Sequence, residues 1–197
     1  MKRKLTVLLL ALCLAFTLGG CRKEAGQTGL PSESQEPSSD VVSGKFDMPD
    51  IRFFDASLLD SSAVTAEDLY GGKDVTVINC WTTWCPPCLE EMDSLAAFEK
   101  TLPDNVQLVS FCVDGLQHTE ECVQILEDAG FEGIVLIDAN GDFRTLLEEM
   151  QYVPTTLFVD SMGSQLSDCL IGAPEDLAKT YTEYINAGLK AQGKDPL

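Results

Sequence analysis

The sequence predicts an α/β domain with a mixed central sheet flanked by helices. From residue 51 onward, short aliphatic and β-branched segments alternate with segments of helical periodicity. This alternation favours a mainly parallel sheet that is covered on both faces. Two late strand-like segments are joined only by a turn at residues 161–164, and such a hairpin makes the sheet mixed. About 150 residues from Phe46 to the end are enough for one domain with a proper core.

Turn and cap residues delimit the individual elements. Thr65 is a predicted N-cap, with Asp68 three positions later in a near capping box. Gly130 ends one helix, residues 140–141 predict a turn, and Pro174 lies in the first turn of the last helix, where its missing N–H is harmless. The predicted strands cover residues 51–54, 61–64, 75–79, 106–113, 134–137, 156–159 and 165–171, the first two forming an N-terminal β-hairpin. The predicted helices cover residues 65–70, 87–102, 119–129, 143–150 and 174–189.

The N-terminal segment is typical of export. Three cations at residues 2–4 precede an apolar run over residues 5–18, which is shorter than the ~20 residues of a membrane span and predicts a secretory signal. The run leads into Leu18-Gly19-Gly20-Cys21, which resembles a bacterial lipobox. We therefore expect residues 1–20 to be a lipoprotein signal peptide and Cys21 to be lipidated. An ordinary signal peptide with an incidental cysteine is the alternative.

Residues 21–45 predict a flexible tether between the lipid and the domain, which covers residues 46–197. The segment is rich in Ser, Glu, Gln, Gly and Pro and cannot bury enough apolar surface to offset its ordering entropy. We therefore expect a lipoprotein on the extracytoplasmic face of the cell membrane, with its partner at or near that membrane. The net charge of −19 argues against nucleic acid as a partner.

Cys85 and Cys88 form the predicted redox centre. Two cysteines three positions apart at the start of a helix lie on one face of its first turn, at a spacing compatible with a disulfide. The free N–H groups and positive dipole end of that turn favour a thiolate. We assign Cys85 as the nucleophile, open to solvent at the helix cap, and Cys88 as the more buried resolving thiol.

The direction of electron flow is predicted from Pro86 and Pro87. Prolines are tolerated in the first helical turn, but they delete two N–H groups that would otherwise stabilise the Cys85 thiolate. A less stabilised thiolate makes a poorer oxidant and a better reductant. This favours a reductase.

Two motifs carry a resemblance to a known family. Trp81-Thr82-Thr83-Trp84-Cys85-Pro86-Pro87-Cys88 follows an apolar strand, and Val153-Pro154-Thr155-Thr156 lies downstream. With the signal and tether, this resembles the TlpA/ResA-like thiol-disulfide oxidoreductase lipoproteins of the thioredoxin superfamily. The resemblance implies a thioredoxin-like fold with a βα insertion at residues 119–137, and a cis Pro154 that faces the cysteine pair. The substrate-binding residues that it implies are Trp84, Pro86, Val153, Pro154 and Thr155.

The resemblance also points to proton chemistry at Glu91. Asn79 stands where cytosolic thioredoxins keep a buried acid, and an amide cannot take up a proton. Glu91 matches a glutamate that ResA-like proteins place near the cysteines, where it assists deprotonation of Cys88. The alternative is a solvated helix carboxylate beside Glu90.

Four further cysteines have no assigned chemistry. Cys80 and Cys112 end neighbouring predicted strands, so a second pair is one hypothesis. Packing as small apolar residues is the stronger one. Cys122 and Cys169 have no visible partner in the sequence.

The resulting functional prediction is a protein-disulfide reductase without a cofactor. By resemblance, it takes electrons from a membrane donor of the CcdA/DsbD type and passes them to oxidised exported proteins, such as apocytochrome c or methionine sulfoxide reductases. One alternative is a peroxiredoxin-like peroxidase, since Thr82 lies three positions before Cys85, although Ile78 stands where that site has a proline. The other is a metal-binding lipoprotein, which the single histidine, His118, disfavours.

Overall fold

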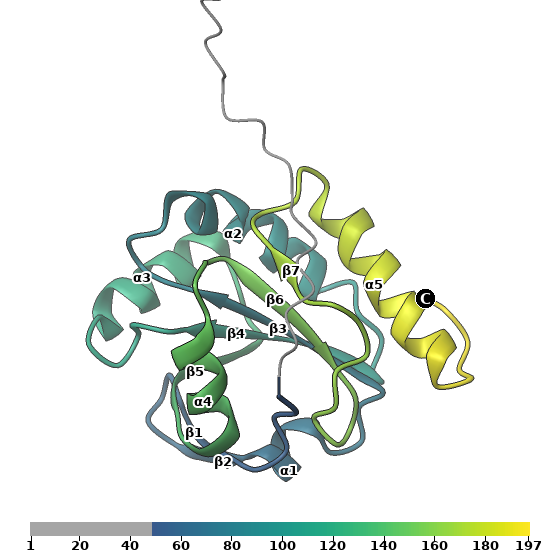
Figure 1. The fold of residues 1–197 in the computed structure, drawn as a ribbon. Coiled ribbons are helices and arrows are strands. Elements are labelled where there is room, and N and C mark those ends of the chain that lie inside the picture. The colour runs from purple at the N-terminus through teal and green to yellow at the C-terminus, as the bar shows by residue number, and fades with distance from the viewer. Residues whose placement is uncertain (1–48) are drawn as a thin grey trace, which may run out of the picture. The chain divides into compact units, whose positions relative to one another are not determined.

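The computed structural model describes residues 49–197, which form a seven-stranded sheet with helices on both faces (Figure 1). The predicted signal peptide, the lipidation site at Cys21 and the tether lie outside the described residues. The strands are β1 (Asp55–Leu58), β2 (Ala63–Thr65), β3 (Val75–Trp81), β4 (Val106–Cys112), β5 (Ile134–Ala139), β6 (Thr155–Val159) and β7 (Leu170–Ile171). The helices are α1 (Ala66–Tyr70), α2 (Pro86–Glu99), α3 (Thr119–Ala129), α4 (Gly141–Glu149) and α5 (Leu177–Ala191).

The sheet is mixed, as predicted. Its strand order is β2-β1-β5-β4-β3-β6-β7. The three central strands β3, β4 and β5 run parallel, whereas β1 pairs antiparallel with β2 and β5. On the other side, β6 pairs antiparallel with β3, and β7 with β6. The N-terminal hairpin and the closing antiparallel strands therefore flank a parallel centre.

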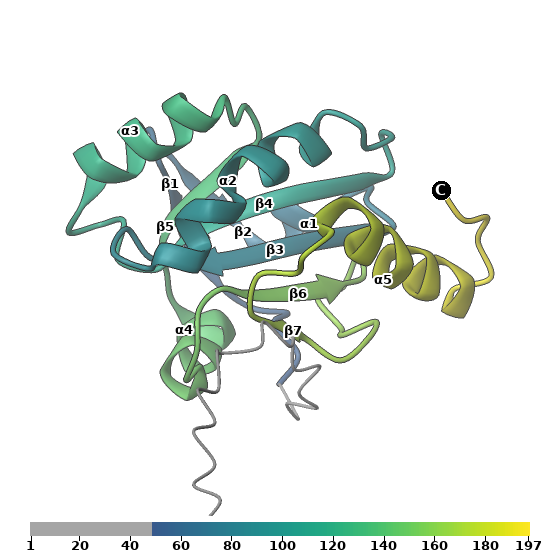
Figure 2. The same cartoon turned by 90° about the horizontal axis from the view of Figure 1, so that it is seen from above.

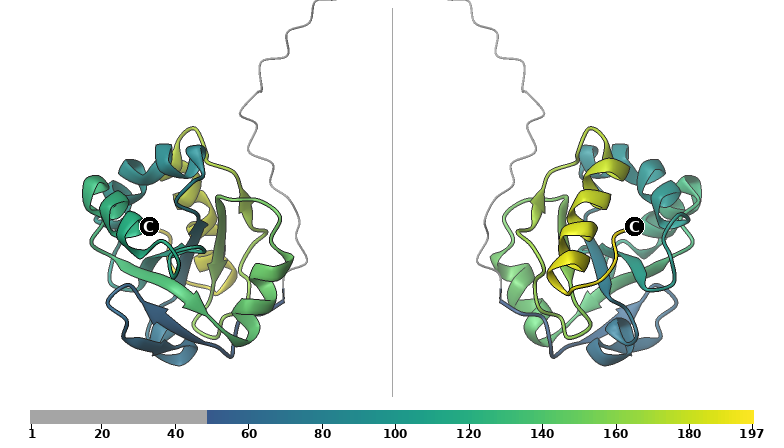
Figure 3. Two further views of the ribbon diagram at one scale, coloured as in Figure 1. Left: turned by 90° about the vertical axis from the view of Figure 1, so that its left-hand side faces the viewer. Right: turned by 90° about the vertical axis from the view of Figure 1, so that its right-hand side faces the viewer.

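The helices are divided between the two faces of the sheet (Figure 2). Buried residues of α2, α3 and α5 pack in one core cluster, and those of α1 and α4 pack in a second. The side views show the same layers (Figure 3). All seven residues of β3 are buried, and their side chains alternate between the two cores because successive residues of a strand point to opposite faces. Thus Trp81 faces the α2 side and Cys80 the α4 side.

Several predicted boundaries were wrong for local reasons. Ile51 and Phe54 are buried, but they precede β1, because the Ile51 N–H donates to the carbonyl of Gly163 rather than to a hairpin partner. The predicted strand at residues 165–171 is reduced to β7 and one isolated bridge. The last helix begins after Asp176, whose carboxylate caps the Lys179 N–H, so Pro174 lies outside it.

The predicted turn at residues 140–141 is the start of α4. Asn140 is the N-cap, and Gly141, at φ +56°, is the first helical residue. A Cβ at Gly141 would overlap the carbonyl oxygen of Phe53. Phe53 is held there because its own N–H donates to Asp142 Oδ2 over 2.9 Å.

Gly141→Ala is expected to destabilise the domain by about 3 kcal/mol, from the left-handed backbone plus the backbone overlap. Gly72→Ala is the matched control, because Gly72 has φ +76° but a Cβ added there would have nothing within 4 Å; its cost is about 1 kcal/mol. Urea unfolding of both variants measures the difference. Equal losses of stability would contradict the close approach of Phe53.

No helix among residues 49–197 is both long enough and apolar enough to cross a bilayer.

Candidate functional site

The cysteine pair lies where β3 passes into α2. The Cys85 N–H donates to the Thr82 carbonyl over 3.3 Å, which closes the turn after the strand. Cys85 is the N-cap of α2, with an extended backbone, and Pro86 and Pro87 occupy the first two helical positions. Cys88 follows in the same turn and is joined to Cys85 in a disulfide, with a Cα–Cα distance of 5.3 Å. The sequence prediction of two cysteines on the first helical turn is thus met.

The pair is less open than predicted. Cys85 keeps 4% of its surface exposed and Cys88 none. The prediction that Cys85 is open to solvent was therefore wrong, whereas the prediction that Cys88 is the more buried of the two is confirmed. The turn is closed tightly enough to bury both sulfurs against the core. Trp84 is 71% exposed beside them, and Pro86 is also exposed. The buried cysteine pair is therefore bordered by an exposed aromatic side chain and an exposed proline.

The loop before β6 faces Cys85. The Val153–Pro154 peptide bond is cis, as the resemblance implied, and the Val153 carbonyl oxygen lies 3.5 Å from Cys85 Sγ. Thr155 Oγ1 donates to the Tyr152 carbonyl over 2.7 Å and holds the turn. Because Thr155 pairs with Cys80 across the sheet, this loop lies at the end of β3 that leads to Cys85.

Glu91 lies in a buried polar cluster beneath the pair. It is 5% exposed, so the alternative of a solvated helix carboxylate is wrong. Asn79 Nδ2 lies 2.9 Å from Glu91 Oε1, and 3.2 Å from both Thr156 Oγ1 and the Tyr181 hydroxyl. Glu91 is one helical turn after Cys88, on the same face of α2. Within this cluster the ionisable group is therefore the carboxyl group of Glu91, since the amide of Asn79 cannot take up a proton. Glu91 is also the member of the cluster that lies on the same helix as Cys88.

Burial raises the pKa of Glu91 to about 7, and the hydrogen bond from Asn79 opposes that rise. The other carboxyl oxygen, Oε2, has no hydrogen-bond partner within residues 49–197, which adds to the cost of a charged carboxylate there. A carboxyl group with a pKa near neutrality exchanges a proton readily at physiological pH. Glu91 is thus a carboxyl group that can take up and release a proton near neutral pH.

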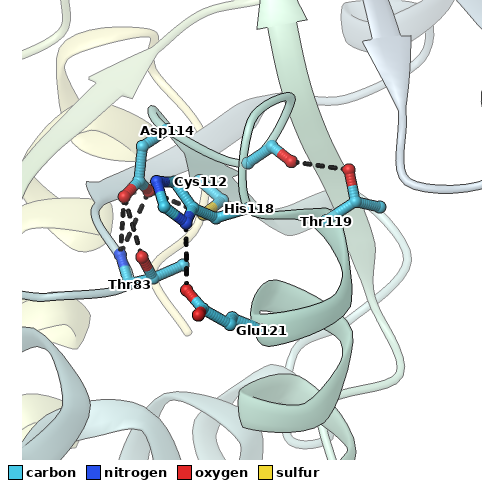
Figure 4. A network of polar contacts seen from close by, with 7 residues as sticks. Thr83, Cys112, Asp114, His118, Thr119 and Glu121 are labelled. Carbon is cyan, nitrogen blue, oxygen red and sulfur yellow. Dashed lines mark hydrogen bonds and ion pairs between the residues drawn. The ribbon is translucent and has the colours of Figure 1, made fainter.

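Three polar residues of the site were missed by sequence reasoning. Thr156 and Tyr181 complete the cluster around Asn79, and a tyrosine on a distant C-terminal helix gave no local signal. Asp114 accepts from the Thr83 N–H over 3.1 Å and from Thr83 Oγ1 over 2.8 Å (Figure 4). It thereby fixes the loop that leads to Cys85. The sequence could have indicated Asp114, because it lies just after β4. The carboxyl ends of parallel strands meet at one sheet edge, so a residue there lies beside the end of β3.

The hypothesis of a Cys80–Cys112 pair is wrong. Cys112 pairs with Trp81 in the β3–β4 register, and Cys80 pairs with Phe111. Cys80 and Cys112 therefore point to opposite faces of the sheet and lie in different cores. Cys122, for which the sequence showed no partner, lies instead against Cys112. Cys169 lies in the core that contains Cys80, and the two interact electrostatically.

The structure gives no support to a metal centre among residues 49–197, where no three His, Cys, Asp or Glu side chains are grouped to hold an ion. His118 is an exposed N-cap of α3, with Nδ1 3.0 Å from Glu121 Oε2 (Figure 4). It is a surface residue, as predicted.

Comparison with known proteins identifies the family. The Redoxin model matches residues 44–164, which is more than half of the chain. The chain belongs to the Redoxin family. Within the matched region lie the cysteine pair, Glu91 and the cis Pro154, together with strands β1 to β6 of the sheet.

Relatives of this Redoxin chain support the predicted resemblance to ResA-like proteins. The thioredoxin-like protein YneN of Bacillus subtilis is 28% identical over 111 residues, 56% of this chain and 63% of that protein. The thiol-disulfide oxidoreductase ResA of Oceanobacillus iheyensis is 29% identical over 116 residues, 58% of this chain and 57% of that protein. The chain thus spans less than two thirds of these relatives.

The crystal structure of StoA from Bacillus subtilis matches the fold, with a TM-score of 0.54 and 18% identity over 70% of this chain and 99% of that one. The predicted thioredoxin-like fold is therefore confirmed. The roles assigned to individual site residues stay predictions.

Proposed function

We propose that this Redoxin chain is a thiol-disulfide oxidoreductase that reduces disulfides in exported proteins. The observation that carries the proposal is the Cys85–Cys88 pair at the start of α2, facing the cis Val153–Pro154 bond. Two thiols that close into a disulfide, next to exposed side chains and a backbone carbonyl, are the minimum for dithiol exchange. The relatives named as thiol-disulfide oxidoreductases support the same activity.

In the proposed reaction the reduced Cys85 thiolate attacks one sulfur of a client disulfide. The client's other sulfur leaves as a thiolate, and a mixed disulfide joins Cys85 to the client. Cys88 then attacks the Cys85 sulfur, the client's second thiolate leaves, and the Cys85–Cys88 disulfide forms. Glu91 accepts the proton of Cys88 before this second step. Two electrons pass from the cysteine pair to the client.

Each part of the site has a place in this scheme. The N-terminal end of α2 stabilises the Cys85 thiolate, although Pro86 and Pro87 supply no N–H groups. We assign client binding to Trp84, Pro86 and the Val153-Pro154-Thr155 turn. Trp84 offers an exposed aromatic surface, and Val153 offers backbone next to the reacting sulfur.

The proposed location is the extracytoplasmic face of the cell membrane. Its support is the sequence of residues 1–45, with positive charges, an apolar run, a lipobox-like Cys21 and a polar tether. Anchored there, the oxidised pair would be reduced again by a membrane donor of the CcdA/DsbD type. The proposed clients are exported proteins such as apocytochrome c or methionine sulfoxide reductases.

The reduction potential of Cys85–Cys88 tests the direction of electron flow. We expect a value at or below roughly −200 mV, because the two prolines weaken thiolate stabilisation relative to strong oxidants. The measurement equilibrates the purified protein with glutathione redox buffers and quantifies both forms by alkylation. A value near roughly −120 mV, that of a strong oxidant, would contradict a reductase while leaving the dithiol chemistry intact.

A further inference from the structure

We propose that Cys112 and Cys122 are a second redox-active dithiol, which a small peroxide converts reversibly to a disulfide. Both side chains are fully buried in the core cluster on the α2 side of the sheet. They face each other from different elements, because Cys112 is the last residue of β4 and Cys122 lies in the first turns of α3. The two thiols lie close enough for each to shift the pKa of the other.

The connecting segment brings the two cysteines together. It folds as consecutive turns: the Gly115 N–H donates to the Cys112 carbonyl over 3.0 Å, and the His118 N–H to the Asp114 carbonyl over 3.1 Å. Thr119 Oγ1 then donates to the Gly115 carbonyl over 2.8 Å (Figure 4). A Cβ at Gly115 would lie only 2.9 Å from the Cys112 Cβ. A glycine is therefore needed for this segment to turn so closely over Cys112.

The surroundings distinguish the two sulfurs. The interaction with the Cys122 thiol, burial and the nearby Asp114 carboxylate all raise the pKa of Cys112. The same interaction lowers the pKa of Cys122, although burial and Asp114 oppose this. Cys112 Sγ is also 3.3 Å from Asp114 Oδ1. Cys122 is therefore the first sulfur to ionise and Cys112 the one that holds the proton, which is the asymmetry a dithiol needs.

The redox step is balanced with a peroxide as oxidant. The Cys122 thiolate attacks one peroxide oxygen, the O–O bond breaks, and a sulfenic acid forms with loss of hydroxide. Cys112 then attacks the Cys122 sulfur, the S–S bond forms and water leaves. The two sulfurs supply two electrons, and hydrogen peroxide becomes two waters after protonation of the hydroxide. A small oxidant reaches the pair when the covering turn opens locally, and the exposed Leu116, Gln117 and His118 of that turn lie at the surface.

Peptide mapping of the full chain carrying Cys85→Ser and Cys88→Ser tests the proposal, and it does so independently of the proposed function. The protein is treated with hydrogen peroxide, free thiols are alkylated, and the digest is analysed by mass spectrometry. We expect one dominant cross-link between the Cys112 and Cys122 peptides, lost on treatment with dithiothreitol. Alkylated, uncrosslinked Cys112 and Cys122 after peroxide treatment would overturn the proposal, and so would irreversible sulfinic acids.

Two further substitutions in that background serve as a matched pair. Cys122→Ala is expected to remove the cross-link, whereas Cys80→Ala, which alters an equally buried cysteine in the other core, leaves it in place. A cross-link at Cys112 that persists in Cys122→Ala would overturn the assignment. Peptide mapping of the Cys85→Ser, Cys88→Ser chain needs no substitution at Cys112 or Cys122. The test therefore remains decisive even if Cys122→Ala fails to fold.

Discussion

Replacing Cys85 with serine is expected to abolish the reduction of insulin by this protein. The rate should fall by at least about 10³-fold, because loss of a nucleophile leaves only the catalysis that binding supplies. Serine keeps the size of the side chain but cannot form a disulfide with the client. The measurement is the rate of insulin precipitation with dithiothreitol as the electron source, corrected for the rate without protein.

Cys88→Ser should behave differently, because Cys85 still attacks but nothing resolves the product. We expect a mixed disulfide between Cys85 and insulin to accumulate, visible on a non-reducing gel. Cys80→Ala is the control, since Cys80 is fully buried on the opposite face of β3 and outside the site; it should retain activity. Wild-type rates in Cys85→Ser would refute the dithiol mechanism. Peroxide turnover by Cys88→Ser, with Cys85 intact, would instead favour the peroxidase alternative.

Glu91→Gln is expected to change how stability depends on pH. The folded-state pKa of Glu91 is raised from 4.5 to about 7, so the folded protein favours the neutral carboxyl group. Its contribution to stability is fully present below pH 4.5 and is lost as the pH rises through 7. A shift of this size corresponds to about 3 kcal/mol. Glutamine stays neutral, so the advantage of the variant over the wild type should grow from pH 4.5 upward and reach about 3 kcal/mol above pH 7.

Urea unfolding at several pH values measures this gain, and Glu90→Gln provides the matched control. Glu90 is the adjacent residue on α2 and is exposed. Its substitution should leave the pH dependence of the free energy of unfolding unchanged. Parallel stability curves for the wild type and Glu91→Gln would contradict a raised pKa.

The same substitution also tests the proton-transfer role. If Glu91 accepts the Cys88 proton, the pH–rate profile of insulin reduction has a limb near pH 7, and Glu91→Gln removes it. The maximal rate falls about 10²-fold, the lower end of what general base catalysis contributes. A purely structural role would instead change stability and leave the profile of the remaining activity unaltered.

The sequence predicted those elements of the fold that depend on the order of neighbouring residues. β3 is a continuous apolar, β-branched run, α3 ends at Gly130 as predicted, and Thr65 with Asp68 forms the expected capping box. The N-terminal hairpin was placed too early, because Ile51 and Phe54 are as apolar as strand residues. Both residues bury their side chains, but the Ile51 N–H donates to the carbonyl of Gly163, outside the hairpin. Such tertiary pairing leaves no trace in the local pattern.

The site was predictable where chemistry depends on spacing along the chain. Cys85 caps α2, Cys88 lies in its first turn and Glu91 follows one turn later, so three-residue spacing was enough. Thr156 and Tyr181 join Asn79 from β6 and α5, and only the folded topology brings them there. The contact between Cys112 and Cys122 was missed because the helix position of Cys122 faces β4 only after the intervening residues have turned.

Both borders of the sheet are formed by very short strands, three residues in β2 and two in β7. A border this short exposes few unpaired N–H and C=O groups, so another chain gains little by adding itself as a continuing strand. Such short borders disfavour edge-to-edge association between copies of the domain. A short border also means that a client peptide has almost no ladder to extend beyond β7, which favours the proposed recognition of its backbone at the Val153 turn, where the Val153 carbonyl oxygen lies 3.5 Å from Cys85 Sγ.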